Sequence, residues 1–247
     1  MTFASPITLI HRVRGLSISV VPIALALCSA ACATGLSLSR PGTAGTAFAP
    51  FGENAIAVYT DIGPYGDKAI TARPILIAVD SGRGVIRIYR PDGPPGYLRG
   101  DAKPILVAEV SDDRVVKFYA AIGPLGDKTF SARPILIAEG DNRGVTRFYK
   151  DIGPLGEKAF VAKPVLIAED DRRSMTKIFR DIGPLGDKTF TALPTLLIED
   201  DNRGTLKLYT DIGVLGDKNF GAKPKVIIEG HGRPQRSLLV VLFQLVN

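Results

Sequence analysis

Residues 134–163 read PILIAEGDNRGVTRFYKDIGPLGEKAFVAK, and this 30-residue pattern recurs along most of the chain. From Tyr59 to about Leu238 it occurs six times with no insertion or deletion. Every copy begins with an aromatic residue and carries two glycines equivalent to Gly153 and Gly156. A fixed period of this kind is typical of repeat architectures in which neighbouring units share one core.

Each copy contains two segments with the character of β-strands. Residues 135–138 (ILIA) are short, rich in β-branched side chains and apolar on both alternations, which predicts a strand buried on both faces. Residues 205–209 (TLKLY) alternate in polarity and predict a half-buried strand. The turn DNRG at 141–144 favours a hairpin between two such strands. A short third strand is expected around Phe130 and its equivalents.

The charge pattern helps to decide how the units are arranged. In a β-solenoid, equivalent residues of successive coils lie about 4.8 Å apart. Like charges at that distance repel by roughly 1 kcal/mol per neighbouring pair even in water. Such a solenoid would stack one cationic series in a ladder: Arg87, Lys117, Arg147, Lys177 and Lys207. We therefore predict an all-β protein whose six hairpin repeats form a propeller-like closed array, with a β-solenoid as the alternative.

The two ends of the repeat region suggest how the array closes. Residues 55–58 (AIAV) resemble the second strand of a unit that lacks its first half. Residues 238–246 (LLVVLFQLV) are an apolar run, which we expect to form a C-terminal closing strand. The repeat domain is therefore expected to span residues 55–247, with its six units at 59–238.

Residues 1–33 resemble a secretory signal peptide. Arg12 and Arg14 precede an uncharged apolar stretch, and residues 31–33 (ACA) offer a small-residue cleavage site. An uncleaved anchor is one alternative, and lipidation of Cys32 at a lipobox-like sequence is another. Residues 34–54 are rich in Gly, Ala, Ser, Thr and Pro and predict a linker. The expected location is periplasmic, cell-surface or secreted.

Composition leaves little room for catalysis. The chain has 247 residues with 45% hydrophobic content, 26 Gly, 18 Pro, 2 Cys, 2 His and a net charge of +6. Cleavage after Ala33 would remove both cysteines and leave His231 as the only histidine. No triad or zinc cluster can then be assembled, so we expect no enzyme. The basic residues are interspersed with acidic ones, which indicates a mixed surface and no nucleic-acid partner.

Two sets of residues are candidates for a site. Acidic and hydroxyl side chains in the predicted hairpin turns provide the oxygen ligands that calcium prefers, although Asp and Asn also favour turns by themselves. The calcium candidates are Asp141, Asn142, Asp170, Asp171, Ser174, Asp201, Asn202 and Thr205. The aromatics at the head of each unit are candidates for stacking on a ligand, or else for a packing layer. They are Tyr59, Tyr89, Tyr119, Tyr149, Phe179 and Tyr209.

Two parts of the repeat resemble known families. The series Tyr149, Asp151, Gly156 and Phe160, followed by DDRRS at 170–174, resembles the motif of microbial βγ-crystallins. This resemblance implies calcium binding by Asp170, Asp171 and Ser174, and by the matching Asp201, Asn202 and Thr205. Residues 134–153 also resemble the strand–turn–strand of FG-GAP-type propeller repeats. Both likenesses imply an all-β protein outside the cytoplasm.

The sequence therefore predicts an exported, non-catalytic binding or structural module of the cell envelope or its exterior. Its expected partner is a glycan or a protein surface, and contact with a membrane is expected only through a lipid on Cys32. A calcium-binding structural repeat protein is the first alternative. A carbohydrate-active enzyme that uses two of the turn carboxylates is the second.

Overall fold

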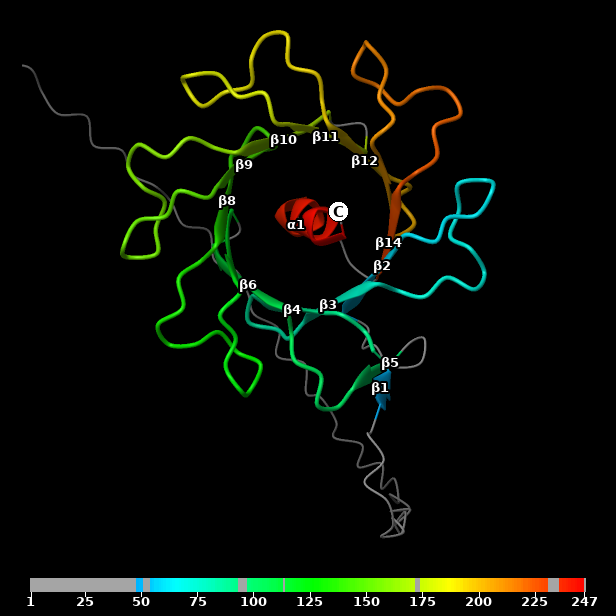
Figure 1. Cartoon of the computed structure of the whole chain (residues 1–247). Coiled ribbons are helices and arrows are strands. Elements are labelled where there is room, and N and C mark those ends of the chain that lie inside the picture. The colour runs from blue at the N-terminus through cyan, green and yellow to red at the C-terminus, as the bar shows by residue number, and fades with distance from the viewer. Residues whose placement is uncertain are drawn as a thin grey trace, which may run out of the picture. The chain divides into compact units, whose positions relative to one another are not determined.

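In the part of the chain that the structure describes, twelve strands form one closed antiparallel β-barrel around one helix (Figure 1). The structure is a computed structural model that describes residues 48–50, 54–92, 97–112, 114–171, 174–230 and 236–246. The expected signal peptide at 1–33, including Cys32, lies outside the described residues. His231 lies outside them as well.

The barrel strands come in two kinds that alternate around the ring. The first strand of each unit is β3 (Leu76–Asp80), β6 (Leu106–Asp112), β8 (Leu136–Gly140), β10 (Leu166–Asp170), β12 (Leu196–Asp200) or β14 (Val226–Gly230). The second strands are β2 (Ala55–Tyr59), β4 (Val85–Tyr89), β7 (Val115–Tyr119), β9 (Val145–Tyr149), β11 (Met175–Phe179) and β13 (Thr205–Tyr209).

The burial of these strands confirms the sequence interpretation. In β8, Leu136 and Ala138 face the barrel interior, while Ile137 faces outward and is still only 1% exposed. In β13, buried Leu206 and Leu208 alternate with half-buried Thr205 and Lys207, and Tyr209 at the strand's end is buried as well. The 141–144 turn forms the predicted hairpin, in which Asp141 N donates to Val145 O at 2.8 Å.

The closed array is confirmed, but it is a barrel and neither a propeller nor a solenoid. The second strand of each unit pairs with the first strand of the next, as Phe148 of β9 does with Leu166 of β10. Separate two-stranded blades would leave every edge strand unpaired, whereas one closed sheet leaves none. Equivalent side chains on alternate strands then lie about 10 Å apart, which removes the repulsion of a stacked ladder.

The third strand expected around Phe130 does not form. Residues 122 and 128 make an isolated β-bridge, and Phe130 lies in a turn in which Ala132 N donates to Thr129 O at 3.0 Å. The closed barrel offers no edge to which a further strand could pair. Four such phenylalanines therefore stand outside the sheet.

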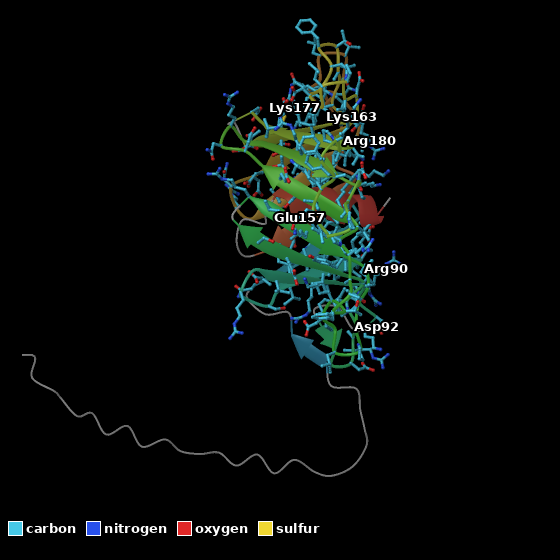
Figure 2. All side chains as sticks on the ribbon, turned by 90° about the vertical axis from the view of Figure 1, so that its left-hand side faces the viewer. Arg90, Asp92, Glu157, Lys163, Lys177 and Arg180 are labelled. Atoms are coloured by element: carbon cyan, nitrogen blue, oxygen red, sulfur yellow. The ribbon has the colours of Figure 1, made fainter. Side chains whose placement is uncertain are left out.

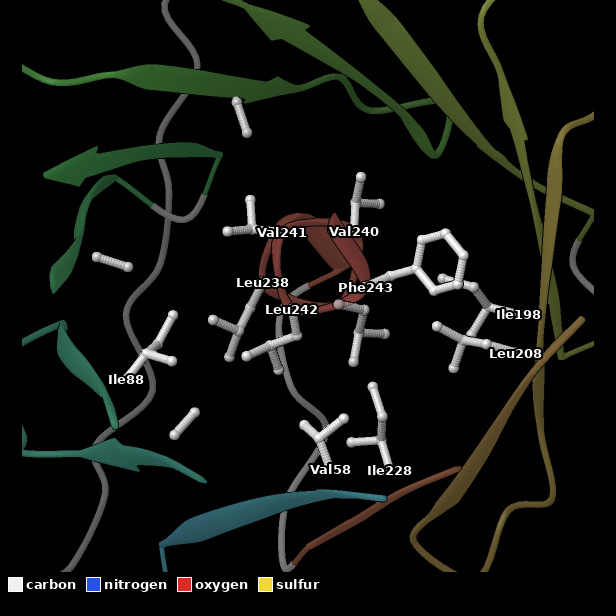
Figure 3. Close-up of a cluster of buried hydrophobic side chains, with 14 of the residues drawn as sticks. Val58, Ile88, Ile198, Leu208, Ile228, Leu238, Val240, Val241, Leu242 and Phe243 are labelled. Atoms are coloured by element: carbon white, nitrogen blue, oxygen red, sulfur yellow. The ribbon is translucent and has the colours of Figure 1, made fainter. Parts of the chain in front are cut away.

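The apolar run at the C-terminus is also different from its prediction. It forms helix α1 (Arg236–Val246), and no closing strand is present at 238–246. Leu238, Leu242 and Phe243 belong to the same buried cluster as Val58, Ile88 and other inward side chains of the barrel (Figure 3). With the sheet already closed, a buried segment must satisfy its own backbone hydrogen bonds, and a helix does so internally.

The barrel is closed by its N-terminal strand instead. β2 pairs with β14, with Val58 opposite Ile228, so the half-unit at 55–58 completes the ring as its sequence suggested. Within the segment interpreted as a linker, a short strand β1 (Phe48–Pro50) pairs antiparallel with β5 (Tyr97–Arg99), which lies outside the barrel sheet.

Candidate functional site

Six outer loops connect the barrel strands at one end and radiate around the ring (Figure 1). They are residues 60–75, 90–105, 120–135, 150–165, 180–195 and 210–225, and we call this end of the barrel the loop end. The 150–165 loop is typical of them. Gly153 N donates to Glu157 O at 2.7 Å, and Ala162 N donates to Ala159 O at 2.9 Å, so the loop consists of two successive tight turns.

Neighbouring outer loops touch through a glycine and a proline. A Cβ placed on Gly156 would lie 3.3 Å from Cδ of Pro134 in the preceding loop. The same contact recurs across the ring closure, where Gly66 approaches Pro224 at 3.3 Å. Pro134 and Pro224 are both buried, so each of these contacts packs one outer loop against the next.

Ion pairs fix five of the six outer loops to the barrel wall, all except the 90–105 loop. Glu157 of the 150–165 loop accepts from Lys117 of β7 at 2.5 Å, and Asp217 accepts from Lys177 of β11 at 2.7 Å. Lys207 makes the equivalent contact with Asp67 across the ring closure at 2.7 Å. These pairs neutralise the cationic series on the second strands.

The lysine after each loop carboxylate makes a second anchor. Lys128 donates to Glu109 of β6 at 2.7 Å, and its Nζ also lies 4.4 Å from the ring centroid of Tyr119. Both contacts favour the charged amine, and the hydrogen bond to Glu109 is the main reason that the pKa of Lys128 is raised. Lys218 repeats the arrangement with Glu199 at 2.6 Å and with Tyr209 at 4.8 Å. Burial, with the Glu199 charge adding to it, raises the pKa of Tyr209 to about 12.

The second outer loop departs from this scheme in a coordinated way. Its positions for the carboxylate and the lysine hold Tyr97 and Leu98, and the wall positions that would pair with them hold Ala57 and Val79. All four charges are thus absent together. This loop contains β5 instead, which is paired to β1.

The most unusual feature of the loops is their exposed apolar side chains. Five loops each present one large apolar residue in the first turn and another in the second, with exposed fractions from 87% to 109%. The first-turn residues are Tyr65, Leu125, Leu155, Leu185 and Leu215, and the second-turn residues are Ile70, Phe130, Phe160, Phe190 and Phe220. Large apolar side chains that are exposed together on one part of a protein typically mark an interaction surface. The sequence offered one signal, a leucine between proline and glycine in a tight turn, where no segment can cover it.

The head-of-unit aromatics have a different environment from the one expected of stacking platforms. Tyr119, Tyr149, Phe179 and Tyr209 are 4–6% exposed. Lysines lie over the first three rings at 4.3–4.7 Å from their centroids. Tyr59 and Tyr89 are half-buried. Tyr119, Tyr149, Phe179 and Tyr209 therefore form a packing layer under the outer loops, because their side chains are almost completely buried.

The calcium candidates lie at the opposite end of the barrel, which we call the hairpin end. Asp141 Oδ1 accepts from Arg143 N at 2.8 Å and from Val145 N at 2.9 Å. Asp201 accepts equivalently from Arg203 N and Thr205 N. The hydrogen bond from Val145, opposed in part by burial, lowers the pKa of Asp141.

The remaining calcium candidates also take part in turn contacts. Asp171 accepts from Met175 N at 3.2 Å, and Asp170 accepts from Thr176 Oγ1 at 2.9 Å. Asn202 Nδ2 donates to Ser174 Oγ at 3.2 Å, which joins two adjacent hairpins. The structure places Asn142 in the exposed turn beside Asp141. Within the described ranges, no three His, Cys, Asp or Glu side chains are grouped so that they could hold a metal ion. Calcium binding remains a prediction.

No helix among the described residues is long and apolar enough to span a membrane.

Comparisons with known proteins leave the family open. No protein-family model matches the chain, and no curated protein matches it. Among solved structures, Sqt1 from Chaetomium thermophilum is similar over 62% of this chain and 56% of its own, with 10% identity and a TM-score of 0.27. The two resemblances described from the sequence are untested by these comparisons.

Proposed function

We propose that this chain is an exported, non-catalytic binding module of the cell envelope or its exterior, and that the outer loops are its binding surface. The observation that carries the proposal is the set of ten exposed apolar side chains at matching positions of five loops. Exposure of this many large apolar groups is costly for solubility, and a partner that covers them accounts for it. The export component rests on the N-terminal sequence at 1–33.

The loops are also built to present these side chains rigidly. Five of the loops are fixed to the wall by ion pairs, and the same five each touch the preceding loop through a glycine–proline contact. A binding surface that is already ordered loses less conformational entropy when it meets its partner. The expected partner is a glycan or a protein surface at the envelope.

The test is sedimentation of the full chain with cell envelopes isolated from the source organism. Replacing Phe130, Phe160, Phe190 and Phe220 with serine should weaken binding by about tenfold or more, because interface energy concentrates in large apolar anchors. The thermal midpoint should stay unchanged, since all four rings are exposed. The matched control replaces four exposed arginines of the hairpin end with glutamine: Arg83, Arg114, Arg143 and Arg203.

Equal losses in the two variants, or no loss in the phenylalanine variant, would place the binding surface elsewhere. Release of new reducing ends when the chain is incubated with envelope glycans would contradict the non-catalytic assignment.

A further inference from the structure

We infer that the outer loops bind an anionic lipid bilayer in place of the glycan or protein surface expected above, a proposal that rests on the binding role of the loops but not on that choice of partner. The inference begins from an asymmetry of charge. The cations of the barrel wall that anchor the loops are all paired with carboxylates. The cations at the loop end are not.

Nine exposed cations at the loop end make no ion pair with the described residues. They directly follow the second strands or lie one to three residues before the first strands, and Figure 2 shows Arg90, Lys163 and Arg180 at the same end of the barrel. The nine are Arg73, Arg90, Lys103, Arg133, Lys150, Lys163, Arg180, Lys223 and Lys225.

The acidic residues near this end do not balance them. Asp61, Asp151, Asp181 and Asp211 are exposed in the loops and are also outside the described ion pairs, while Asp92 and Asp101 pair with Arg99. Among the described residues the hairpin end has no such excess, because Asp80, Asp141, Asp200 and Asp201 lie there beside Arg83, Arg114, Arg143 and Arg203. The excess positive charge is therefore confined to the end that carries the exposed apolar groups, which is complementary to an anionic surface.

In four of the five loops that expose apolar residues, a cation follows the second-turn apolar residue, whereas the 180–195 loop has Leu193 at that position. Arg133 follows Phe130 by three residues, and Lys163 follows Phe160 by the same interval. The span between them is at most about 10 Å of chain. An apolar group that enters the acyl region and a cation at headgroup level a short distance away is the arrangement by which peripheral proteins bind anionic membranes.

The type of apolar residue separates a bilayer from other anionic partners. A nucleic acid or a glycan would be bound by flat aromatic faces on which bases or sugars stack. Half of the ten exposed residues are aliphatic and have no such face: Ile70, Leu125, Leu155, Leu185 and Leu215. Leucine gains from transfer into hydrocarbon, so the combination with phenylalanine favours lipid.

The experiment is flotation of the full chain with vesicles of pure phosphatidylcholine and with vesicles that contain roughly one-third phosphatidylglycerol. Binding is expected on the anionic vesicles at about 0.1 M salt, and it should weaken severalfold at about 1 M salt because the charge attraction is screened. Every variant carries the same N-terminal segment, so differences between variants report on the loops.

Two variants and one matched control test the site. Changing Lys103, Arg133, Lys163 and Lys223 to glutamine should weaken vesicle binding by about tenfold or more, and so should the four phenylalanine-to-serine changes. Changing Arg83, Arg114, Arg143 and Arg203 to glutamine removes the same charge from the hairpin end, and vesicle binding should stay within about twofold of the unaltered chain. Circular dichroism and the thermal midpoint confirm that each variant is folded.

The outcomes separate this inference from the broader proposal. Binding to envelopes without binding to anionic vesicles would overturn the lipid inference and leave a glycan or protein partner. Equal binding to both kinds of vesicle, or equal losses in the control, would also overturn it. Tighter binding to dextran sulfate or single-stranded DNA than to vesicles, with no effect of the phenylalanine changes, would identify an anionic polymer as the partner.

Discussion

Gly156 shows how one residue contributes to the assembly of the whole ring. Its φ of 75° lies in the left-handed region, and a Cβ there would stand 3.3 Å from Pro134 Cδ. Replacing it with alanine should destabilise the protein by about 1–2 kcal/mol, measured by urea denaturation. Gly153 is the matched control, since its φ is not positive and a Cβ would meet Glu157 O at an ordinary 3.5 Å. Equal losses at the two glycines would contradict this role.

Asp141 predicts a pH dependence at the opposite end of the barrel. Its pKa in the folded chain is lowered, chiefly by the hydrogen bond from Val145 N. A depressed carboxyl pKa stabilises the fold above the ordinary value of 3.8, and this contribution is lost as the pH falls through the folded pKa.

Asp141→Asn keeps an oxygen acceptor but removes the charge. We therefore expect the variant to have a lower thermal midpoint than the original chain at pH 6 and a difference that shrinks towards pH 2. A difference that is constant over this range would show that the charge is not responsible. Thermal unfolding followed by circular dichroism at a series of pH values measures this difference in midpoint.

At the scale of elements, the width of the barrel matches the width of helix α1 with its side chains. Twelve strands about 4.8 Å apart and tilted by about 40° close into a ring of roughly 12 Å radius. A helix with its side chains has a radius of about 5–6 Å, which leaves room for one layer of inward side chains. Small residues such as Ala138 and Ala168 supply part of this space. Without α1, the interior of the ring would be an apolar void.

Leu242 tests this dependence directly, because it is 0% exposed inside the barrel. Leu242→Ala should destabilise the protein by about 3 kcal/mol, through lost burial and the cavity that remains. Gln244→Ala on the same helix is the control, since Gln244 is only half-buried and the change should cost less than about 1 kcal/mol. Similar midpoints of urea denaturation for the two variants would show that the helix is not packed in the barrel.

The elements that could be predicted from the sequence are those that local patterns encode. The strand pairs and the hairpin turn follow from local patterns, such as the doubly apolar 135–138 and the DNRG turn, and the structure confirms them. Fusion of the hairpins into one sheet depends on β9 pairing with β10 across a 16-residue loop, and no local pattern encodes that pairing.

The predictions for two elements were wrong, and in both cases the reason is that the closed sheet decides the local structure. An apolar run such as 238–246 reads equally as a buried strand or a buried helix, and only the closure of the sheet by β2 decides between them. Phe130 has high strand propensity, but propensity has no effect where no sheet edge is available. The exposed loop surface escaped prediction because large apolar residues are normally assigned to a core.

At the scale of the whole molecule, the contacts repeat around the ring without interruption at the chain ends. Lys207 and Asp67 are 140 residues apart, yet they are joined at 2.7 Å like Lys177 and Asp217, which are 40 residues apart. In the second outer loop both members of one ion pair are absent together, because Tyr97 and Ala57 stand at their positions. The ion pairs therefore belong to the closed ring and not to individual repeats.

Closure of the ring can be measured by comparing these two ion pairs in double-mutant cycles. Their distances are equal, and the lysine exposures of 25% and 26% and the aspartate exposures of 65% and 74% are similar. In a closed barrel both should show a coupling free energy of about 0.5 kcal/mol that decreases with salt, as partly exposed pairs do. In an open array Lys207 would have no partner at Asp67, so its coupling would vanish while that of Lys177 and Asp217 persisted. Urea denaturation of the alanine variants at low salt measures both coupling free energies. In a closed sheet the two values should agree, because the strands hold both pairs at the same distance whatever their separation in sequence.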